Sequence, residues 1–495
     1  MDGFGVHTFR FVTDDGYSKL IKIHLKSKQG LASLVWSEAQ VLSGKNIDYH
    51  RNDLFEAIDS GNFPEWELGV QVMDEEDVLR FEGIDLLDPT KIVPVEDVPI
   101  TPIGKVVLNR NTLNYFAETE QSMYCPGHVV RGIDFSDDPL LQGRLFSYVD
   151  TQLNRNMGSP NFEQIPINRP RAEVHNNNRD GAGQQFIHSN IHPYSENTLN
   201  DGSPMLANQT QGNGFFTAPA RRIVDAQYVR DVSPTFMDFF TQPRLFYNSL
   251  TAPEQQMLIN AARFELSNVR SNTVRANSIF QFNRIDHDFA ERVASALGMT
   301  APPPDPTYYN NRSTTGVSVF RDPLPTIATL KVGILTSTSS GSSNSNSSDG
   351  MNTAKALASA MRARGAVPSI IAETLTDGVD RTYINSDAVL FDAIVVADGT
   401  DALFGTPSPL YPTNRPAQIV RDAYNYGKPV AGIGAGGRTG FEAAGLGGEG
   451  GVAEDAKSLG VYMVEETGEA AVEGLADMLE DGLKVFKFLE RFPID

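Results

Sequence analysis

The stretch of sequence that decides the fold is DFSDDPLLQGRLFSYVDTQ, residues 134–152. If this stretch is helical, Arg144 and Tyr148 are four residues apart and lie on one face of the helix. A guanidinium beside a phenol favours the ionised phenolate. A phenolate is a hard, anionic oxygen donor, and such a donor suits ferric iron. Spacing alone favours a simpler interpretation, a helix with a buried Arg–Tyr contact, so the surrounding motifs must decide.

Four further motifs flank this stretch: Val107-Leu108-Asn109-Arg110-Asn111, Asn114-Tyr115-Phe116-Ala117-Glu118, Pro126-Gly127-His128 and Pro166-Ile167-Asn168. Together with Arg144-x-x-x-Tyr148 they resemble the signatures of the haem catalases. From Gly3 to about Gly298 the chain is similar to the large-subunit branch of that family, which has an extra C-terminal domain. The resemblance continues less specifically through the C-terminal third of the chain.

The resemblance implies the residues of a haem site. Catalases are the standard example of haem held by a tyrosine, so Tyr148 is expected to be the axial iron ligand and Arg144 to keep it ionised. Leu141 and Gln152 match positions that flank the haem on this proximal side. Cys125 matches a position that some large-subunit relatives join covalently to the ligand tyrosine. A thioether between Cys125 and Tyr148 is therefore implied, and a buried inert thiol is the alternative.

The resemblance also implies an activity and its partners. The expected enzyme is a catalase that converts hydrogen peroxide to water and oxygen and so protects against oxidative stress. The expected cofactor is haem of the b or d type with its iron, and the expected assembly is a homotetramer. One alternative is an inactive remnant with a structural or chaperone-like C-terminal domain. Another makes that domain the functional part, binding a nucleotide or unfolded proteins.

One part of the family pattern is missing from this sequence. The family places its distal histidine in a Val-x-His-Ala-Arg-Gly motif, with an asparagine further along, and general acid–base catalysis needs such groups close to the substrate. None of the eight histidines lies in that motif, so we predict that no distal catalytic residue is present. The distal motifs precede the segment that Met1–Phe9 resembles. The chain is therefore expected to be truncated at its N-terminus and to begin inside the family's barrel.

Composition excludes several other classes of protein. The net charge of −21 disfavours binding to nucleic acid or to anionic membranes. No apolar run approaches the ~18–20 residues that span a bilayer. A single cysteine forbids an internal disulfide and any cysteine-rich metal site. Neither a secretory signal nor a peroxisomal ending is present, so a cytoplasmic location is expected.

Local patterns divide the chain into five parts. Alternating segments around Ile21–Leu25 and Trp66–Val72 predict strands, as does Val6–Val12, and Leu31–Leu42 and Asp53–Ser60 look helical. A capping box at Thr251 and Glu254 begins a helical region. The predicted parts are an incomplete antiparallel β-barrel (1–123), a wrapping segment with the proximal helix (124–232), an α-helical domain (233–299), a linker (300–328) and a flavodoxin-like α/β domain (329–495).

The C-terminal part alternates short apolar strands with helices, and this alternation predicts a doubly wound parallel sheet. Gly432-x-Gly434-x-x-Gly437 follows one of the strands and imitates a dinucleotide fingerprint. No ribose-binding acid follows at the expected place, so a glycine-rich turn is the better interpretation. The candidate strand-to-helix elbow, Asp398-Gly399-Thr400-Asp401, has no cysteine, which excludes thiol catalysis there.

Overall fold

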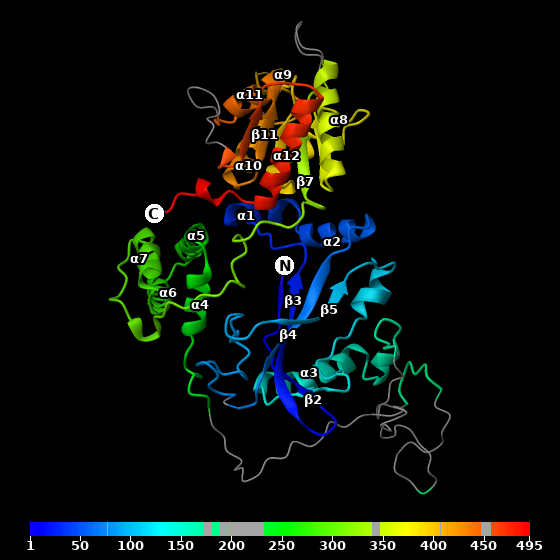
Figure 1. Cartoon of the computed structure of the whole chain (residues 1–495), viewed down its shortest axis with the longest axis vertical. Coiled ribbons are helices and arrows are strands. Elements are labelled where there is room, and N and C mark those ends of the chain that lie inside the picture. The colour runs from blue at the N-terminus through cyan, green and yellow to red at the C-terminus, as the bar shows by residue number, and fades with distance from the viewer. Residues whose placement is uncertain are drawn as a thin grey trace.

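The structure is a computed structural model that describes residues 1–76, 78–171, 180–187, 198, 232–338, 347–405, 407–412, 414–446 and 457–495. Much of the predicted wrapping segment 124–232 lies outside these residues. Figure 1 shows the first sheet and α3 at the bottom, a group of helices beside them and the C-terminal α/β part at the top. The molecule is a mixed α and β protein. None of the helices in the described ranges is long and apolar enough to cross a bilayer.

The first sheet is antiparallel and follows the order β5-β4-β3-β2-β6, with β1 also paired to β3. Its strands are β1 (Gly3–Phe4), β2 (Phe9–Val12), β3 (Ser18–Ser27), β4 (Glu65–Met73), β5 (Thr101–Val107) and β6 (Ile133–Phe135). Along this path β5 and β6 are the two ends of the sheet. The antiparallel sheet is as predicted, and its closure into a barrel stays a prediction.

One face of this sheet buries polar side chains. Lys22 and Gln71 are each 1% exposed and His24 is also buried, whereas Val72 on the opposite face is exposed. His24 Nε2 lies 2.8 Å from Gln71 Oε1, and the Gln71 amide donates to the carbonyl oxygen of Val93 at 3.0 Å. Burial lowers the pKa of His24. Alternation thus predicted the strands, but it did not predict that their polar residues would face the interior.

The first predicted strand, Val6–Val12, is wrong at its beginning. Phe4 pairs with His24 and Phe9 pairs with Ile21, so the four residues from Gly5 to Thr8 face only two residues of β3. The extra residues form a bulge between β1 and β2, and a bulge of this kind turns its side chains away from the regular alternation. We call residues 5–8 the β1–β2 bulge.

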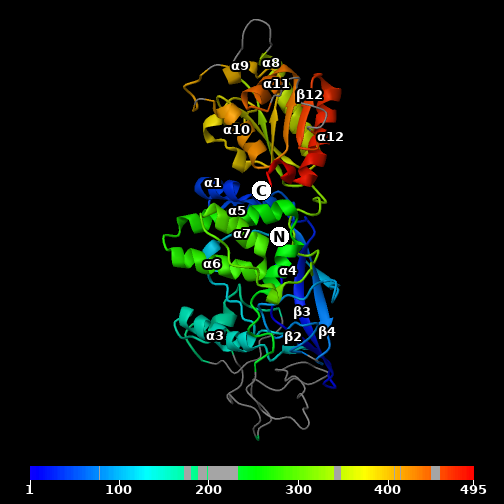
Figure 2. The same cartoon turned by 90° about the vertical axis from the view of Figure 1, so that its left-hand side faces the viewer.

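Two helices connect β3 to β4. They are α1 (Trp36–Lys45) and α2 (Tyr49–Asp59), where the sequence predicted Leu31–Leu42 and Asp53–Ser60. Helix α1 begins five residues later than predicted, where the Glu38 side chain accepts from the backbone N–H of Val35 at 3.3 Å. Both views place α1 directly against the C-terminal α/β part (Figures 1 and 2).

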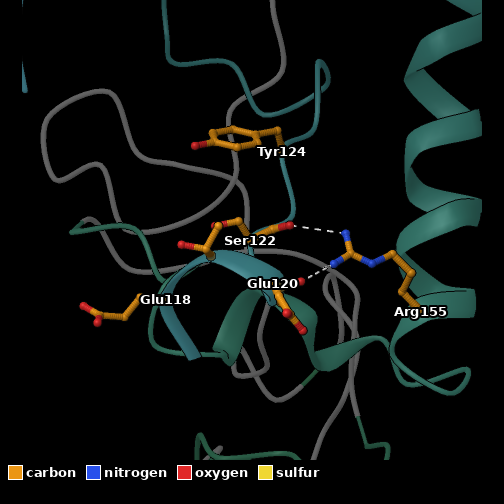
Figure 3. A pocket seen from close by; sticks show the side chains of 6 residues that line it. Glu118, Glu120, Ser122, Tyr124 and Arg155 are labelled. Atoms are coloured by element: carbon orange, nitrogen blue, oxygen red, sulfur yellow. Dashed lines mark hydrogen bonds between the residues drawn. The ribbon is translucent and has the colours of Figure 1, made fainter. Parts of the chain in front are cut away.

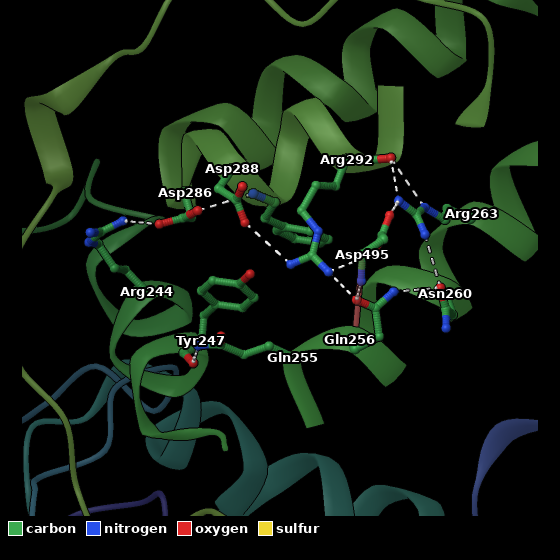
Figure 4. Close-up of polar contacts among 11 residues, drawn as sticks. Arg244, Tyr247, Gln255, Gln256, Asn260, Arg263, Asp286, Asp288, Arg292 and Asp495 are labelled. Atoms are coloured by element: carbon green, nitrogen blue, oxygen red, sulfur yellow. Dashed lines mark hydrogen bonds and ion pairs between the residues drawn. The ribbon is translucent and has the colours of Figure 1, made fainter. Parts of the chain in front are cut away.

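The helical group contains α4 (Thr241–Ser249), α5 (Ala252–Asn268), α6 (Asn272–Ile285) and α7 (His287–Ala296). The predicted capping box is present, because Glu254 accepts from the backbone N–H of Thr251 at 2.8 Å and from its hydroxyl. The C-terminal segment reaches this group, where the carboxylate of Asp495 pairs with Arg263 and with Arg292, the latter at 2.7 Å (Figure 4). Short helical turns elsewhere are η1 (Phe116–Glu120), η2 (Asn161–Gln164), η3 (Pro306–Tyr308), η4 (Tyr383–Asn385), η5 (Ala388–Leu390) and η7 (Leu489–Arg491).

The C-terminal part is built on a parallel sheet in the order β12-β11-β10-β7-β8-β9, as the strand–helix alternation predicted. Its strands are β7 (Lys331–Leu335), β8 (Val367–Ala372), β9 (Arg381–Thr382), β10 (Ala393–Val396), β11 (Val430–Ile433) and β12 (Val461–Val464). Its helices are α8 (Ser347–Ala363), α9 (Asp401–Gly405), α10 (Arg415–Asn425), α11 (Gly434–Ala443) and α12 (Glu469–Val485). Helices α8 and α12 cover one face of the sheet, and α10 and α11 cover the other.

Helix α1 completes the second of these two cores. Val35 and Leu42 are buried in the same apolar cluster as residues of β7, β10 and α10. Glu38 is 0% exposed, and its carboxylate lies 2.6 Å from the ammonium groups of both Lys428 and Lys487. A buried carboxylate needs such partners, because an unpaired charge in the interior is costly. The C-terminal part is therefore packed and charge-paired with a helix from the first hundred residues.

Candidate functional site

The proximal segment forms the expected helix, α3 (Pro139–Arg155). Asp138 caps its first turn by accepting from the backbone N–H groups of Leu140 at 2.9 Å and Leu141 at 3.0 Å. Proline at the first helical position has no N–H to satisfy and already has a helical φ. This start fixes the phase of the helix, and with it the direction in which Arg144 and Tyr148 point.

Arg144 and Tyr148 contact each other as predicted. Nη2 of Arg144 donates to the phenolic oxygen of Tyr148 at 2.6 Å, and the guanidinium lies 4.9 Å from the centre of the phenol ring. Both side chains are half-buried. The guanidinium is a permanent cation, so a fixed positive charge lies beside the phenolic oxygen.

A third residue, His7, holds the other side of the guanidinium. Its Nε2 lies 2.7 Å from Nη1 of Arg144, and its Nδ1 lies 2.7 Å from Oδ2 of Asp138. A guanidinium can only donate, so Nε2 accepts and Nδ1 carries the proton that is donated to the carboxylate. The result is a continuous row of hydrogen bonds, which we call the proximal relay: Asp138, His7, Arg144 and Tyr148.

The sequence did not predict the proximal relay. His7 is 137 positions before Arg144 and 131 before Asp138, so no local spacing connects them. Asp138 lies within residues 134–152, but its spacing alone suggested no role. The connection arises because β2 pairs with β6, just before α3, and the bulge beside β2 turns His7 towards the start of that helix.

The other predicted haem-side residues are packed in this structure. Leu141 and Gln152 are buried. The Gln152 amide donates to the carbonyl of Tyr124, and its Oε1 has no hydrogen-bond partner among the residues that the structure describes. Cys125, the next residue after Tyr124, is half-buried. A Cβ on Gly127 would lie 3.6 Å from the sulfur of Cys125 and 3.9 Å from the side chain of Leu145. The turn that carries Cys125 therefore packs against α3.

Within the described ranges, the remaining histidines do not assemble a second site. His24 bonds to Gln71, His128 pairs with Glu163 at 2.8 Å and His287 lies 2.7 Å from Asn283. His175, His188 and His192 lie outside the described residues. Within the part of the chain that the structure describes, no group of three or more His, Cys, Asp or Glu side chains could hold a metal ion. The tyrosine oxygen of the proximal relay is therefore the candidate metal donor.

An open pocket of about 650 Å³ lies at the far end of α3, lined by Glu118, Thr119, Glu120, Ser122, Tyr124 and Arg155. Arg155 donates to the backbone carbonyls of Glu120 and Ser122 (Figure 3). Arg155 is two helical turns from Tyr148, and the Tyr124 ring is 84% exposed. The pocket is thus separate from the proximal relay, and we assign no ligand to it.

The glycine-rich turn after β11 is internally filled. Gly434 has a φ of +66°, and a Cβ there would overlap the carboxylate of Asp398. The backbone N–H of Gly436 points at Asp398 Oδ1, 3.4 Å away. A Cβ on Gly437 would lie 2.7 Å from the Cα of Gly432. The glycines allow close contact between strand and helix, and a carboxylate of the chain itself stands where a phosphate would bind, which supports the prediction of a turn.

The fold and the proximal relay together define a mixed α and β protein in which a tyrosine oxygen lies against a fixed guanidinium. Three family models match the chain. They are described as Catalase at residues 1–201, Catalase-related immune-responsive at residues 233–297 and C-terminal domain found in long catalases at residues 328–493. The chain belongs to the catalase family, in its large-subunit branch.

Individual relatives agree with the family models. Over its full length the chain is 54% identical to Catalase B of Aspergillus oryzae, of which it covers 67%. It is 54% identical to Catalase-3 of Neurospora crassa, of which it covers 66%. Catalase HPII of Pseudomonas putida is 50% identical over 61% of this chain and 42% of that relative. The chain thus spans about two thirds of the length of its fungal relatives.

Proposed function

We propose that this chain decomposes hydrogen peroxide to water and oxygen as a haem-dependent catalase. The observation that carries the proposal is the 2.6 Å contact between Arg144 and Tyr148, in a chain with 54% identity to fungal catalases over its full length. This homology supports the catalase activity and does not favour the inactive-remnant alternative.

The proximal relay suits the haem that the family implies, because it combines a phenol with a fixed cation. In the proposed site Tyr148 holds the iron, and bound haem supplies the redox chemistry of ferric iron. Arg144 keeps the phenolic oxygen ionised, and His7 and Asp138 keep Arg144 in place. Orientation by outer partners of this kind commonly changes metal affinity or activity by about 10–100-fold. The haem type, b or d, belongs to the proposal.

Two further assignments are part of the proposal. Leu141 and Gln152 flank the haem from α3. Gln152 also holds the carbonyl of Tyr124, and so fixes the backbone next to Cys125. A thioether joins Cys125 to Tyr148, and the packing of the Cys125 turn on α3 supports it. A tryptic digest of haem-loaded protein tests this link by mass. Separate, unlinked Cys125 and Tyr148 peptides would contradict it.

The substrate side and the assembly are proposals from the family. Hydrogen peroxide is the proposed substrate and a homotetramer the proposed state. We assign no distal catalytic residue among the described residues. The absence of nucleic-acid and membrane partners stays a prediction from the composition. The cytoplasmic location stays a prediction from the lack of a recognisable targeting signal in this sequence.

We also propose the finer classification of the two sheets. The strand sequence β8-β7-β10-β11-β12 corresponds to the order 2-1-3-4-5 of flavodoxin-like folds, which supports that assignment for the C-terminal part. The first sheet is proposed to be part of a catalase-type barrel. The five domain boundaries predicted above are kept as proposals.

The function is tested by adding haem to the purified full chain. A Soret band together with oxygen release from peroxide supports the catalase. Haem binding without oxygen release favours the remnant. The absence of a Soret band would contradict a haem protein. Deleting residues 1–325 to test the C-terminal part alone would also remove Val35, Glu38 and Leu42 from its core, so the full chain is the correct sample.

A further inference from the structure

The β1–β2 bulge interrupts the backbone hydrogen bonds of the sheet next to His7. Four residues face two on β3, so the bulged backbone cannot complete the regular ladder of hydrogen bonds. Buried carbonyl groups need a partner, because an unsatisfied one costs free energy comparable to a lost hydrogen bond. Side chains can supply such partners where the ladder does not.

Two side chains supply them, one on each side of His7. The ammonium of Lys22, on β3, donates to the carbonyl of Val6 at 2.7 Å. The hydroxyl of Ser136, just before α3, donates to the carbonyl of Thr8. His7 is thus the residue between two backbone carbonyls that are each held by a buried side chain.

The bulge is also pressed against β3. A Cβ on Gly5 would overlap the carbonyl oxygen of Ile23, so only glycine allows this approach. The close contact brings the Val6 carbonyl within reach of Lys22, which is 1% exposed. A buried ammonium that donates to the backbone of the residue before His7 is unusual enough to require an explanation.

Electrostatics connects Lys22 to the proximal relay as well. Burial lowers the pKa of Lys22 to about 8, and the charges of Asp138, Asp88 and Asp85 oppose that shift. Asp138 is the carboxylate that accepts from His7. The cation therefore acts on His7 from two directions, through the backbone of Val6 and through the charge of Asp138.

We propose that Lys22 is a positioning residue for the haem site: it holds the β1–β2 bulge so that the His7 ring stays between Asp138 and Arg144. Arg144 is then kept on the Tyr148 oxygen. The proposal rests on the proposed function only in its last step, from Arg144 and Tyr148 to haem. The orientation of His7 can be measured without haem.

The direct test is nitrogen NMR of the full chain labelled with ¹⁵N-histidine, without haem. His7→Gln identifies the His7 signals. A ring fixed in one neutral tautomer gives two widely separated ring-nitrogen signals, and a ring that exchanges between tautomers gives signals closer to their average. Lys22→Met, which keeps length but loses the donor, is expected to move the His7 signals towards that average. Lys22→Arg, which keeps a charged donor, is expected to restore most of the separation.

Lys91→Met is the matched control. Lys91 is also a buried lysine that donates to a backbone carbonyl, that of Asp238 at 2.9 Å, and it does not touch the proximal relay. This variant is expected to leave the His7 signals in place. Unmoved His7 signals in a folded Lys22→Met protein would overturn the proposal. If Lys22→Met does not fold, Lys22→Gln replaces it. The shorter amide of Gln is expected to move the same His7 signals by a smaller amount. Unmoved His7 signals would again overturn the proposal.

Haem binding provides the second readout. Lys22→Met is expected to weaken haem retention about 10-fold, as loss of an outer partner commonly does, with partial recovery in Lys22→Arg and none of this loss in Lys91→Met. The experiments distinguish a failure of the positioning role of Lys22 from a failure of the haem assignment. If His7 responds to Lys22 but Tyr148→Phe leaves the haem spectrum unchanged, the positioning role stands and the haem assignment fails. If Tyr148→Phe removes the spectrum while His7 ignores Lys22, the positioning role fails.

Discussion

Arg144 donates to the phenolic oxygen of Tyr148 across 2.6 Å and, with its other terminal nitrogen, contacts His7 across 2.7 Å. The two contacts occupy both ends of a planar guanidinium, so its direction is fixed by groups from α3 and from the β1–β2 bulge. In the proposed site this fixed cation stands beside the oxygen that would bind the iron.

We predict that His7→Leu weakens haem retention by about 10–100-fold, the range typical for loss of an outer partner. The substitution also leaves the buried Asp138 carboxylate without its histidine donor, so the free energy of unfolding should fall by about 1–3 kcal/mol. Haem titration and urea unfolding measure the two effects. His50→Leu, an exposed histidine on α2, is the control and should change neither. Equal behaviour of the two variants would contradict the relay.

Glu38 joins α1 to the C-terminal part by bridging Lys428 and Lys487. We predict that Glu38→Gln lowers the free energy of unfolding by about 3–5 kcal/mol, because two buried ammonium groups lose their counter-charge. Glu56→Gln is the matched control, since Glu56 pairs with Lys331 at an exposed position and should cost about 0–1 kcal/mol. Denaturant unfolding compares them. A loss for Glu38→Gln no larger than for Glu56→Gln would show that the bridge does not hold the parts together.

Stability should rise with pH in the alkaline range. Burial, reinforced by the charge of Lys428, lowers the pKa of Lys487 to about 8. An unfolded lysine titrates near ~10.4, so from pH ~8 upwards the unfolded chain binds more protons than the folded one, and the free energy of unfolding increases with pH. Lys22 acts in the same window, because its pKa is also lowered to about 8.

This effect is measured by urea unfolding between pH ~7.5 and ~9.5. Above that window the tyrosines oppose it, because burial raises the pKa of Tyr426 and Tyr462 to about 12 and their unfolded forms ionise first. Lys487→Met is expected to flatten the slope, whereas Lys28→Met, at an exposed position, should preserve it. A slope that is unchanged in Lys487→Met would contradict the assignment.

Two glycines in the C-terminal part should respond in opposite ways to alanine. Gly434→Ala puts a Cβ on the Asp398 carboxylate at a φ of +66°, and we predict a loss of about 1–3 kcal/mol in the free energy of unfolding. Gly474, inside α12, has open space around its Cβ position, so Gly474→Ala should stabilise by roughly 0.5–1 kcal/mol. Thermal unfolding separates these outcomes. A harmless Gly434→Ala would mean that the turn is not filled by Asp398.

The sequence predicted what local spacing determines. Arg144 and Tyr148 are one helical turn apart, and Thr251 and Glu254 form a capping box, so their contacts needed no long-range information. It could not predict the contacts of His7, because strand pairing brings the partners of this residue to it. Nor could it predict that Lys22 would be buried, because alternation separates the two faces of a strand without saying which one faces a polar interior.

Periodicity also could not predict which part of the chain helix α1 packs against. Helix α1 was predicted within the first part of the chain, yet its Val35 and Leu42 complete a core of the C-terminal part. Periodicity shows that a helix has an apolar face but does not identify the surface that it meets.

The most direct test of the central claim is the absorption spectrum of the haem-loaded full chain with Tyr148→Phe, recorded beside the unaltered protein and with oxygen release from peroxide measured on both. Tyr124→Phe, whose ring is exposed at the pocket beside Arg155, is the control. We expect Tyr148→Phe to lose the tyrosinate–iron spectrum and the oxygen release, and Tyr124→Phe to keep both. A Tyr148→Phe protein with unchanged spectrum and unchanged oxygen release would contradict the assignment of Tyr148 as the iron ligand.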